Sequence, residues 1–293
     1  MRSIIDSVET LGIIGLSKNT GKTTTLNKII EIYQDLTLGL TSIGLDGESL
    51  DQVNFLPKPR IVVKPRMVVA TAYECLESSL VEFEILHATN LQTALGNVHI
   101  VRIRSEGTMI IAGPTTNHDL NELILLLKPY VDKILVDGAF NRMTFASIES
   151  LDAIVLATGA AYSIDMNKTI QQTKHIVESF NLEQTKEFES TPHESLLIHT
   201  NRRDLVFHEK NISVFHKISF ELNEKILYMY IKGAITEKMI DYFIAQDLRG
   251  FTLICDDPTK LLFKDQYFEY IKKLNIELKV IHQTPLLFVT INP

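Results

Sequence analysis

The sequence predicts an α/β protein with a mostly parallel sheet in its first part and a smaller α/β module at its C-terminal end. Three observations support this fold class. Short apolar runs alternate with helical patterns along the chain of 293 residues. An apolar run at residues 11–14 leads through a glycine-containing turn into a helical pattern. The polar segment 183–195 has no apolar period and is predicted to be a linker. We therefore expect domains at residues 1–183 and 196–293.

Composition limits the classes of partner and compartment. Hydrophobic residues make up 45% of the chain and charged residues 22%, and the net charge of −7 gives no general attraction to nucleic acid or acidic membranes. The two cysteines, Cys75 and Cys255, lie far apart, as in proteins of a reducing cytoplasm. No apolar run approaches the roughly twenty residues that span a bilayer. We expect a cytoplasmic protein without nucleic-acid or membrane partners.

A complete G-x-x-x-x-G-K-[ST] motif connects the first strand to the first helix. It reads Gly15-Leu16-Ser17-Lys18-Asn19-Thr20-Gly21-Lys22-Thr23. The two glycines let successive backbone N–H groups turn toward phosphate oxygens, and the helix start adds its positive dipole end. Lys22 is expected to reach the β- and γ-phosphates and Thr23 to hold Mg²⁺ through its hydroxyl. A chance glycine turn is the alternative, and the strand and helix on either side disfavour it.

The motif therefore predicts ATP and Mg²⁺ as ligands. The expected nucleotide-binding residues are Gly15, Lys18, Asn19, Thr20, Gly21, Lys22, Thr23 and Thr24. Lys18 is open between a phosphate contact and an ordinary solvated lysine.

Two acidic residues follow predicted strands and complete the candidate site. Asp46 ends the strand expected at residues 38–45, and Asp137 ends the apolar run Ile134-Leu135-Val136. Carboxylates at strand ends near a phosphate loop can face metal-bound water or the nucleophile. We expect Lys22, Asp46 and Asp137 to be catalytic, and Thr23, Asp46 and Asp137 to be directed at the metal. The alternative for Asp46 is an ordinary Asp-Gly turn.

The middle of the chain is less regular. Four basic residues at positions 58, 60, 64 and 66 could bind phosphate or a carboxylate substrate, or could be charges at strand ends. Residues 72–95 suggest an insertion, and residues 98–104 and 108–112 suggest a hairpin. Asn117 could cap the helix that follows. Arg142 could stabilise phosphate charge or form a salt bridge.

The remaining pattern completes the alternation. A strand at 152–156 precedes a helix at 165–180, and no Asn-Lys-x-Asp motif for guanine follows that strand, so adenine is the expected base. The C-terminal module is expected to contain strands at 226–231, 251–255, 276–282 and 286–291 and helices at 237–248 and 265–274. The sequence stops directly after an apolar run, which is compatible with a missing short tail. No metalloprotease or serine hydrolase motif is present.

The loop, the two acids and the strand–helix alternation of residues 10–180 resemble P-loop NTPases of the class that includes dethiobiotin synthetases, partitioning ATPases and metallochaperone GTPases. The resemblance implies a P-loop core in which Lys22 binds phosphate, Thr23 binds Mg²⁺, and Asp46 and Asp137 match the class's two strand-end acids. Partitioning members carry a further lysine where this chain has Leu16. Dimerisation through such a lysine is therefore not implied.

A narrower resemblance rests on the segments 16–23, 42–48 and 136–139, which are similar to an ATPase subunit of lysine 5,6-aminomutase reactivases. It implies ATP-dependent reactivation of an adenosylcobalamin-dependent aminomutase, with that mutase or a second reactivase subunit as partner. Three functions follow as expectations: an ATPase coupled to a client protein, a small-molecule kinase or ATP-dependent ligase, and a scaffold that binds ATP without hydrolysing it.

Overall fold

The computed structural model describes residues 1–44, 61–138, 150–207 and 224–292. It divides into two compact units: Met1–Thr169 with Thr284–Pro293, and Ile170–Gln283. Both are α/β, which confirms the predicted fold class at that level. The boundaries differ from the predicted 1–183 and 196–293, because the last strand of the chain belongs to the sheet of the first unit.

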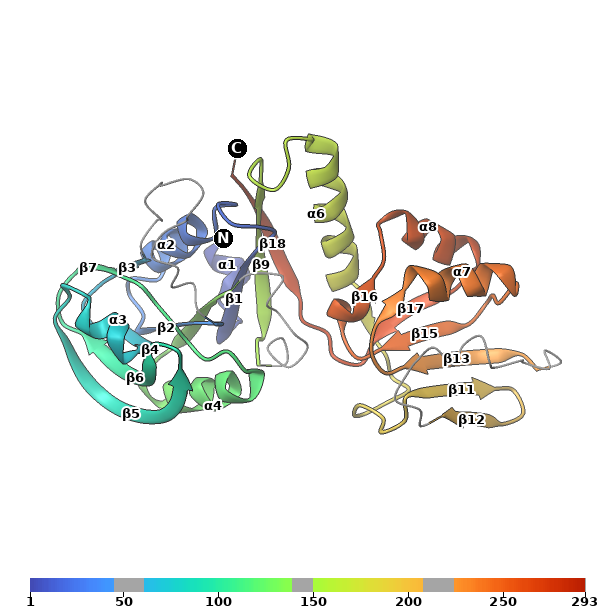
Figure 1. The fold of residues 1–293 in the computed structure, drawn as a ribbon, viewed down its shortest axis with the longest axis horizontal. Helices are drawn as coiled ribbons and strands as arrows, with labels where there is room; N and C mark the ends of the chain where they lie inside the picture. Colours follow the sequence, from blue (N-terminus) through green and yellow to red (C-terminus); the bar gives the residue numbers. More distant parts are fainter. Residues whose placement is uncertain (45–60, 139–149, 208–223, 293) are drawn as a thin grey trace. The chain divides into compact units, whose positions relative to one another are not determined.

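The first unit is built on an eight-stranded sheet in the order β18-β9-β1-β8-β2-β4-β6-β5 (Figure 1). Neighbouring strands from β18 to β4 are parallel, and β6 and β5 are antiparallel additions at one edge. The strands of this sheet are β1 (Thr10–Gly15), β2 (Leu38–Ser42), β4 (Val68–Ala72), β5 (Phe83–Thr93), β6 (Gly96–Ile103), β8 (Lys133–Asp137), β9 (Ala153–Gly159) and β18 (Leu286–Asn292). A separate pair is formed by β3 (Ile61–Val63) and β7 (Gly107–Met109).

The helical segments of this unit are α1 (Arg2–Ile5), α2 (Lys22–Ile32), α3 (Tyr73–Glu77), α4 (Asn117–Leu127) and the short 3₁₀ turn η1 (Lys128–Tyr130). Helix α6 (Met166–Phe180) begins in this unit and continues in the second. In α2, Leu26, Ile29 and Ile30 are buried in one cluster with Leu11 and Ile13 of β1. This i, i+3, i+4 spacing places them on the helix face that covers the sheet.

The hairpin predicted in the middle of the chain is wrong. Residues 98–104 and 108–112 do not form a hairpin, because β6 pairs with β4 and β5 while β7 pairs with β3. Residues 72–95, predicted as an insertion, form α3 and the strand β5 at the antiparallel edge of the sheet. The cap of α4 is Thr116, whose hydroxyl accepts a hydrogen bond from the Asp119 N–H at 3.2 Å, and Asn117 is the first helical residue.

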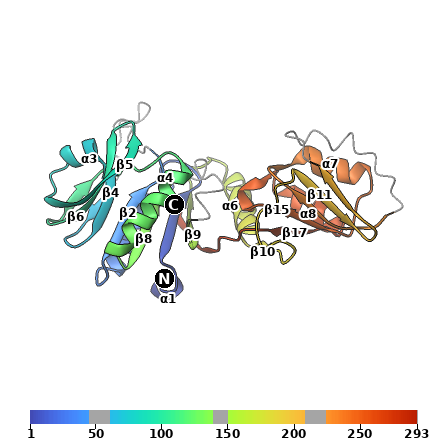
Figure 2. The same cartoon turned by 90° about the horizontal axis from the view of Figure 1, so that it is seen from below.

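The second unit has a six-stranded sheet in the order β10-β17-β15-β13-β11-β12 (Figure 2). Along this order, the neighbouring strands β10, β17, β15 and β13 are parallel. Strand β11 is antiparallel to both β13 and β12. The elements are β10 (Glu183–Gln184), β11 (Leu196–Thr200), β12 (Asp204–Phe207), β13 (Ile226–Ile231), β14 (Ile235–Thr236), α7 (Glu237–Ala245), β15 (Thr252–Cys255), η4 (Pro258–Lys260), β16 (Leu261–Leu262), α8 (Gln266–Lys273) and β17 (Glu277–Val280).

Helices α7 and α8 bury their apolar faces in the core of this second unit. Ile240, Phe243, Phe268 and Ile271 join strand residues such as Leu253 in one cluster. The segment 183–195, predicted as a linker, contributes β10 and Phe188, which packs against Tyr228 and Tyr230 on a smaller cluster. The second unit therefore has its own core.

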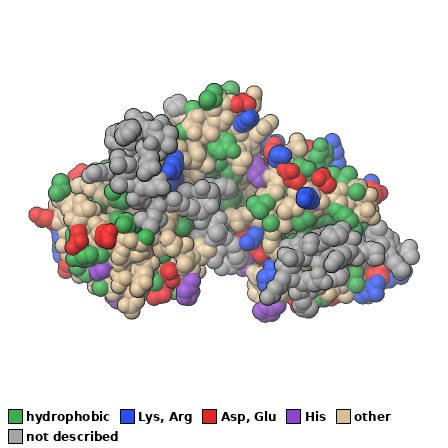
Figure 3. Space-filling model, viewed as in Figure 1, with side chains coloured by type: hydrophobic (Ala, Val, Ile, Leu, Met, Phe, Trp, Pro, Cys, Tyr) green, Lys and Arg blue, Asp and Glu red, His purple; other side chains and the backbone are tan. Residues whose placement is uncertain are grey.

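Exposed apolar side chains gather where the chain enters α6. Ile164, Met166 and Ile170 lie at the surface, and Figure 3 shows hydrophobic side chains over this end of the helix. None of the described helices is long and apolar enough to cross a membrane.

Candidate functional site

The glycine motif lies at the carboxyl end of a central strand. Strand β1 ends at Gly15 between the parallel strands β8 and β9, and α2 begins at Lys22. The connecting segment is held to the sheet at its start, because the Leu16 N–H donates to the Ala157 carbonyl at 3.1 Å. Carboxyl ends of parallel strands are the edge where α/β sheets bind ligands. The structure thus places the predicted loop where this rule expects a site.

Both glycines of the motif lie at positions where a larger residue would be disfavoured. A Cβ on Gly15 would lie 2.6 Å from Lys22 Cγ and 2.7 Å from Thr20 Oγ1, so a side chain at the end of β1 would displace Lys22 and Thr20. Gly21 has φ +91°, a left-handed conformation that disfavours other residues. Asn19 also has positive φ, +62°. Within the loop, the Thr20 hydroxyl donates to the Ser17 carbonyl at 2.9 Å. The loop is therefore a compact turn with two left-handed residues.

Two predicted catalytic residues meet at this edge. Lys22 Nζ lies 3.6 Å from Asp137 Oδ1, and their side chains are only 11% and 7% exposed. Asp137 ends β8, the strand beside β1, and its backbone carbonyl accepts from the Ile43 N–H at 2.8 Å. An incoming polyanion could replace the carboxylate as the partner of the buried ammonium. A cation could then replace the ammonium as the partner of the carboxylate.

The other predicted residues are distributed around the loop. Thr23 is half-buried in the first turn of α2, whereas Lys18, Asn19 and Thr24 are exposed. The N-terminus of α2 carries the positive end of the helix dipole, which favours an anion there. Thr23 and Asp137 are the described residues that could contribute to a magnesium site. Among the described residues no group of three or more His, Cys, Asp or Glu forms a metal cluster.

Several predictions lie outside the described residues. These are Asp46, Lys58, Arg60 and Arg142. Of the basic stretch, Lys64 and Arg66 are described, and the Arg66 N–H donates to the Ile103 carbonyl at 3.0 Å. Arg66 has a φ of +79° in the turn between β3 and β4. The assignment of these two residues to a substrate site stays a prediction.

Sequence reasoning missed the contribution of the last strand. The Asn292 side-chain N–H donates to the Asn19 carbonyl at 3.1 Å, and the Thr290 and Thr25 hydroxyls are 2.8 Å apart. We assigned residues 286–291 to the C-terminal module because they follow it in sequence. The available signal was the polar residue that ends an apolar strand, as Asp137 does.

Comparisons with known proteins found no match to this chain. No protein-family model matches the chain, and neither the curated proteins nor the solved structures contain a match.

Proposed function

We propose that the protein is a P-loop nucleoside triphosphatase that binds Mg-ATP at residues 15–24 and couples its hydrolysis to a partner protein. The observation that carries this proposal is the loop between β1 and α2 with Lys22 Nζ 3.6 Å from Asp137 Oδ1. The strand, the motif and the helix are contiguous at residues 10–32, whereas Asp137 lies more than a hundred residues later and still reaches the same edge of the parallel sheet. A chance glycine turn does not account for that convergence.

The residues divide the chemistry between them. Backbone N–H groups of the loop and the Lys22 ammonium would bind the phosphates, and Thr23 and Asp137 would face Mg²⁺. When bound, Mg²⁺ would neutralise the negative charge that develops on the phosphate oxygens. Binding would transfer Lys22 from Asp137 to phosphate, which leaves the Asp137 carboxylate available to the metal and its water. Catalysis would arise from positioning and charge neutralisation.

The client is proposed from the resemblance of the loop, residues 42–48 and residues 136–139 to reactivase ATPases. An adenosylcobalamin-dependent aminomutase, or a second reactivase subunit, is the partner that this resemblance implies. The second unit, with its own core and no glycine loop of this kind, would engage the client. The alternative is a small-molecule kinase or ATP-dependent ligase, in which Asp46 or the basic residues 58–66 would orient a metabolite. An ATP-binding scaffold without hydrolysis is the third proposal.

Phosphate release from Mg-ATP and Mg-GTP tests the proposal. Wild type, Lys22→Ala and Lys28→Ala are compared with and without a candidate aminomutase. Lys28 is the matched control, since it lies on the same helix, is exposed, and pairs with Glu31 at 2.9 Å. We expect slow ATP hydrolysis that the mutase accelerates, that Lys22→Ala abolishes and that Lys28→Ala leaves unchanged.

The other outcomes identify the alternatives. Fast turnover that needs only a small-molecule fraction would indicate a kinase or ligase. Nucleotide binding without hydrolysis under any condition would indicate a scaffold. Equal ATP binding by wild type and Lys22→Ala would overturn all three.

A further inference from the structure

The last strand, β18, returns to the first unit after the whole of the second unit has been traversed. It pairs in parallel with β9 from Leu286 opposite Ile154 to Asn292 opposite Gly159. Because β9 is the direct neighbour of β1, the carboxyl end of β18 reaches the same edge of the sheet as the glycine loop. Figure 1 shows β18 in red beside β9 in green.

Two side chains of β18 contact the loop and the helix that follows it. Asn292 Nδ2 donates to the Asn19 carbonyl at 3.1 Å, and Thr290 Oγ1 is hydrogen bonded to Thr25 Oγ1 at 2.8 Å. Residues 290 and 292 share one face of the strand because side chains alternate. Ile291, between them, is 77% exposed. The strand therefore presents one polar group to the loop, one to α2 and an apolar one to solvent.

The end of β18 is closely packed between the loop and β9. A Cβ on Gly21 would lie 3.0 Å from Asn292 Cβ, and a Cβ on Gly159 would lie 2.0 Å from the Asn292 carbonyl oxygen. That same carbonyl accepts from the Ala160 N–H at 3.2 Å. Glycines on both sides thus allow Asn292 to approach the loop, and the backbone of Asn292 is itself fixed to the sheet.

The hydrogen bond from Asn292 to the Asn19 carbonyl also orients the Thr20 N–H. The peptide group between Asn19 and Thr20 is planar and trans, so its carbonyl and its N–H point in opposite directions. When Asn292 holds the Asn19 carbonyl toward β18, the Thr20 N–H is directed away from β18. Asn19 has a φ of +62°, a left-handed conformation that asparagine adopts more readily than most residues and that neighbouring contacts can stabilise. Asn292 supplies one such contact.

From these contacts we infer that Asn292 and Thr290 are positioning residues for the phosphate loop: they hold the Asn19–Thr20 peptide and the first turns of α2 in the conformation that binds polyphosphate. The inference rests on the proposed nucleotide site. It also means that the attachment of β18, which continues directly from the second unit, influences nucleotide affinity.

The test measures equilibrium binding of Mg-ATP and of inorganic tripolyphosphate to the full chain. The variants are Asn292→Ala, the pair Thr290→Val and Thr290→Ser, and the control Ile291→Ala. We expect Asn292→Ala and Thr290→Val to weaken both ligands by about three- to tenfold, the range that corresponds to one neutral hydrogen bond. Thr290→Ser keeps the hydroxyl and is expected to restore affinity, and Ile291→Ala is expected to bind like wild type.

Tripolyphosphate separates positioning from direct recognition, because it has neither base nor ribose. Weaker binding of ATP with unchanged binding of tripolyphosphate would mean that Asn292 touches the nucleoside, which overturns the inference. Affinities within twofold of wild type for both Asn292→Ala and Thr290→Val would also overturn the inference. If Asn292→Ala does not fold, the Thr290 pair decides. Failure of wild type to bind either ligand, or Lys22-independent binding, would instead refute the proposed function.

Discussion

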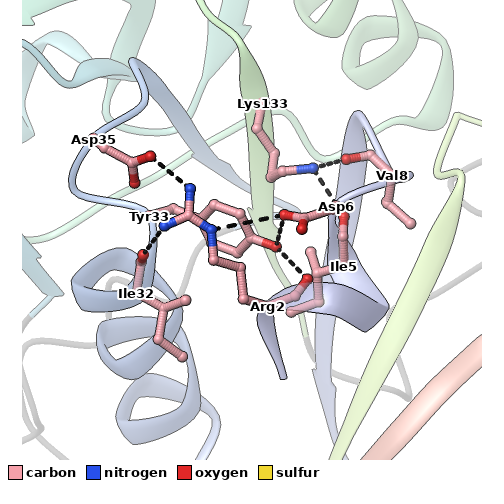
Figure 4. A network of polar contacts seen from close by, with 8 residues as sticks. All are labelled: Arg2, Ile5, Asp6, Val8, Ile32, Tyr33, Asp35 and Lys133. Atoms are coloured by element: carbon pink, nitrogen blue, oxygen red, sulfur yellow. Dashed lines mark hydrogen bonds and ion pairs between the residues drawn. The ribbon is translucent and has the colours of Figure 1, made fainter.

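Lys133 is a buried lysine at the start of β8, at the other end of the strand from Asp137. Its ammonium donates to the carbonyls of Ile5, at 3.0 Å, and Val8, and lies 5.4 Å from the centre of the Tyr33 ring (Figure 4). Burial lowers the pKa of Lys133. The side chain therefore fixes the segment after α1 to the sheet by satisfying two backbone acceptors.

We expect Lys133→Met to lower the free energy of unfolding by about 1–3 kcal/mol, because the Val8 carbonyl loses its Lys133 donor and the Ile5 carbonyl keeps only the Val8 N–H at 3.0 Å. Urea denaturation measures the change. The matched control is Lys128→Met, since Lys128 is half-exposed and its ion pair with Glu9, at 3.5 Å, contributes about 0–1 kcal/mol. Equal effects of the two substitutions would contradict this role for Lys133.

Tyr33 gives the same network a dependence on pH. Its single hydroxyl proton is shared between the Arg2 carbonyl, at 2.9 Å, and Asp6 Oδ1, at 3.0 Å, and burial raises its pKa from 10.0 to about 12. Because the folded-state pKa is above the unfolded-state value, the stabilisation from Tyr33 is complete below pH 10 and is lost as the pH rises toward 12.

We therefore expect Tyr33→Phe to destabilise the protein by about 1 kcal/mol at pH 8. The difference in stability between wild type and Tyr33→Phe should shrink between pH 10 and pH 12. Urea midpoints of the two proteins across this range give the measurement. A difference that stays constant or grows with pH would show that Tyr33 does not retain its proton in the folded state.

Among the elements, those with local signals were predictable. The apolar run 11–14 and the glycine motif gave β1 and α2, and the run before Asp137 gave β8. Strand pairing was not predictable in the same way. Residues 98–104 and 108–112 look like a hairpin because a short turn separates them, but each finds its partner elsewhere, in β4 and β5 or in β3. Pairing depends on burial in the whole sheet, and alternation along one segment does not report it.

The contact between the end of β2 and the segment before α4 is one such non-local pairing. The Gly113 N–H donates to Ser42 Oγ at 2.9 Å, and Ser42 Oγ donates to the Ile111 carbonyl at 3.1 Å. A Cβ on Gly113 would lie 1.9 Å from the Ser42 carbonyl oxygen. A backbone atom cannot rotate away as a side chain can, so the segment must shift.

We expect Gly113→Ala to cost about 3 kcal/mol of stability. Gly138→Ala is the control, because its Cβ would meet Ile43 Cδ1 at 3.5 Å, an ordinary contact, and the expected cost is below about 1 kcal/mol. Chemical denaturation of both variants gives the comparison. If Gly113→Ala is as stable as the control, β2 does not approach residue 113 this closely.

At the scale of the molecule, the sequence indicated two α/β parts but placed β18 in the second. Order along the chain is a good guide to neighbours only while connections are short, and here residues 170–283 separate β9 from the strand that pairs with it. The Asn292 and Thr290 contacts could not be predicted for the same reason. The roles of Lys22 and Asp137 could be predicted from sequence, because Lys22 belongs to the glycine motif that follows one apolar strand and Asp137 is the acid that ends another.

Each unit contains one buried cysteine, Cys75 in the first and Cys255 in the second. Burial raises the pKa of both thiols, so neither is expected to react with alkylating agents in the folded protein. Alkylation therefore reports the opening of each unit separately. In a urea series with brief alkylation and mass spectrometry, each cysteine gives the unfolding midpoint of its own unit.

Mg-ATP at about 100 times its dissociation constant should add about 2.7 kcal/mol to the stability of the unit that binds it. We expect the alkylation midpoint of Cys75 to move to higher urea while that of Cys255 stays within error, because the proposed loop belongs to the first unit. The Lys22→Ala variant should show no shift for either thiol. A shift of Cys255 alone would place the nucleotide in the second unit. Equal shifts of both would show that the two units unfold as one.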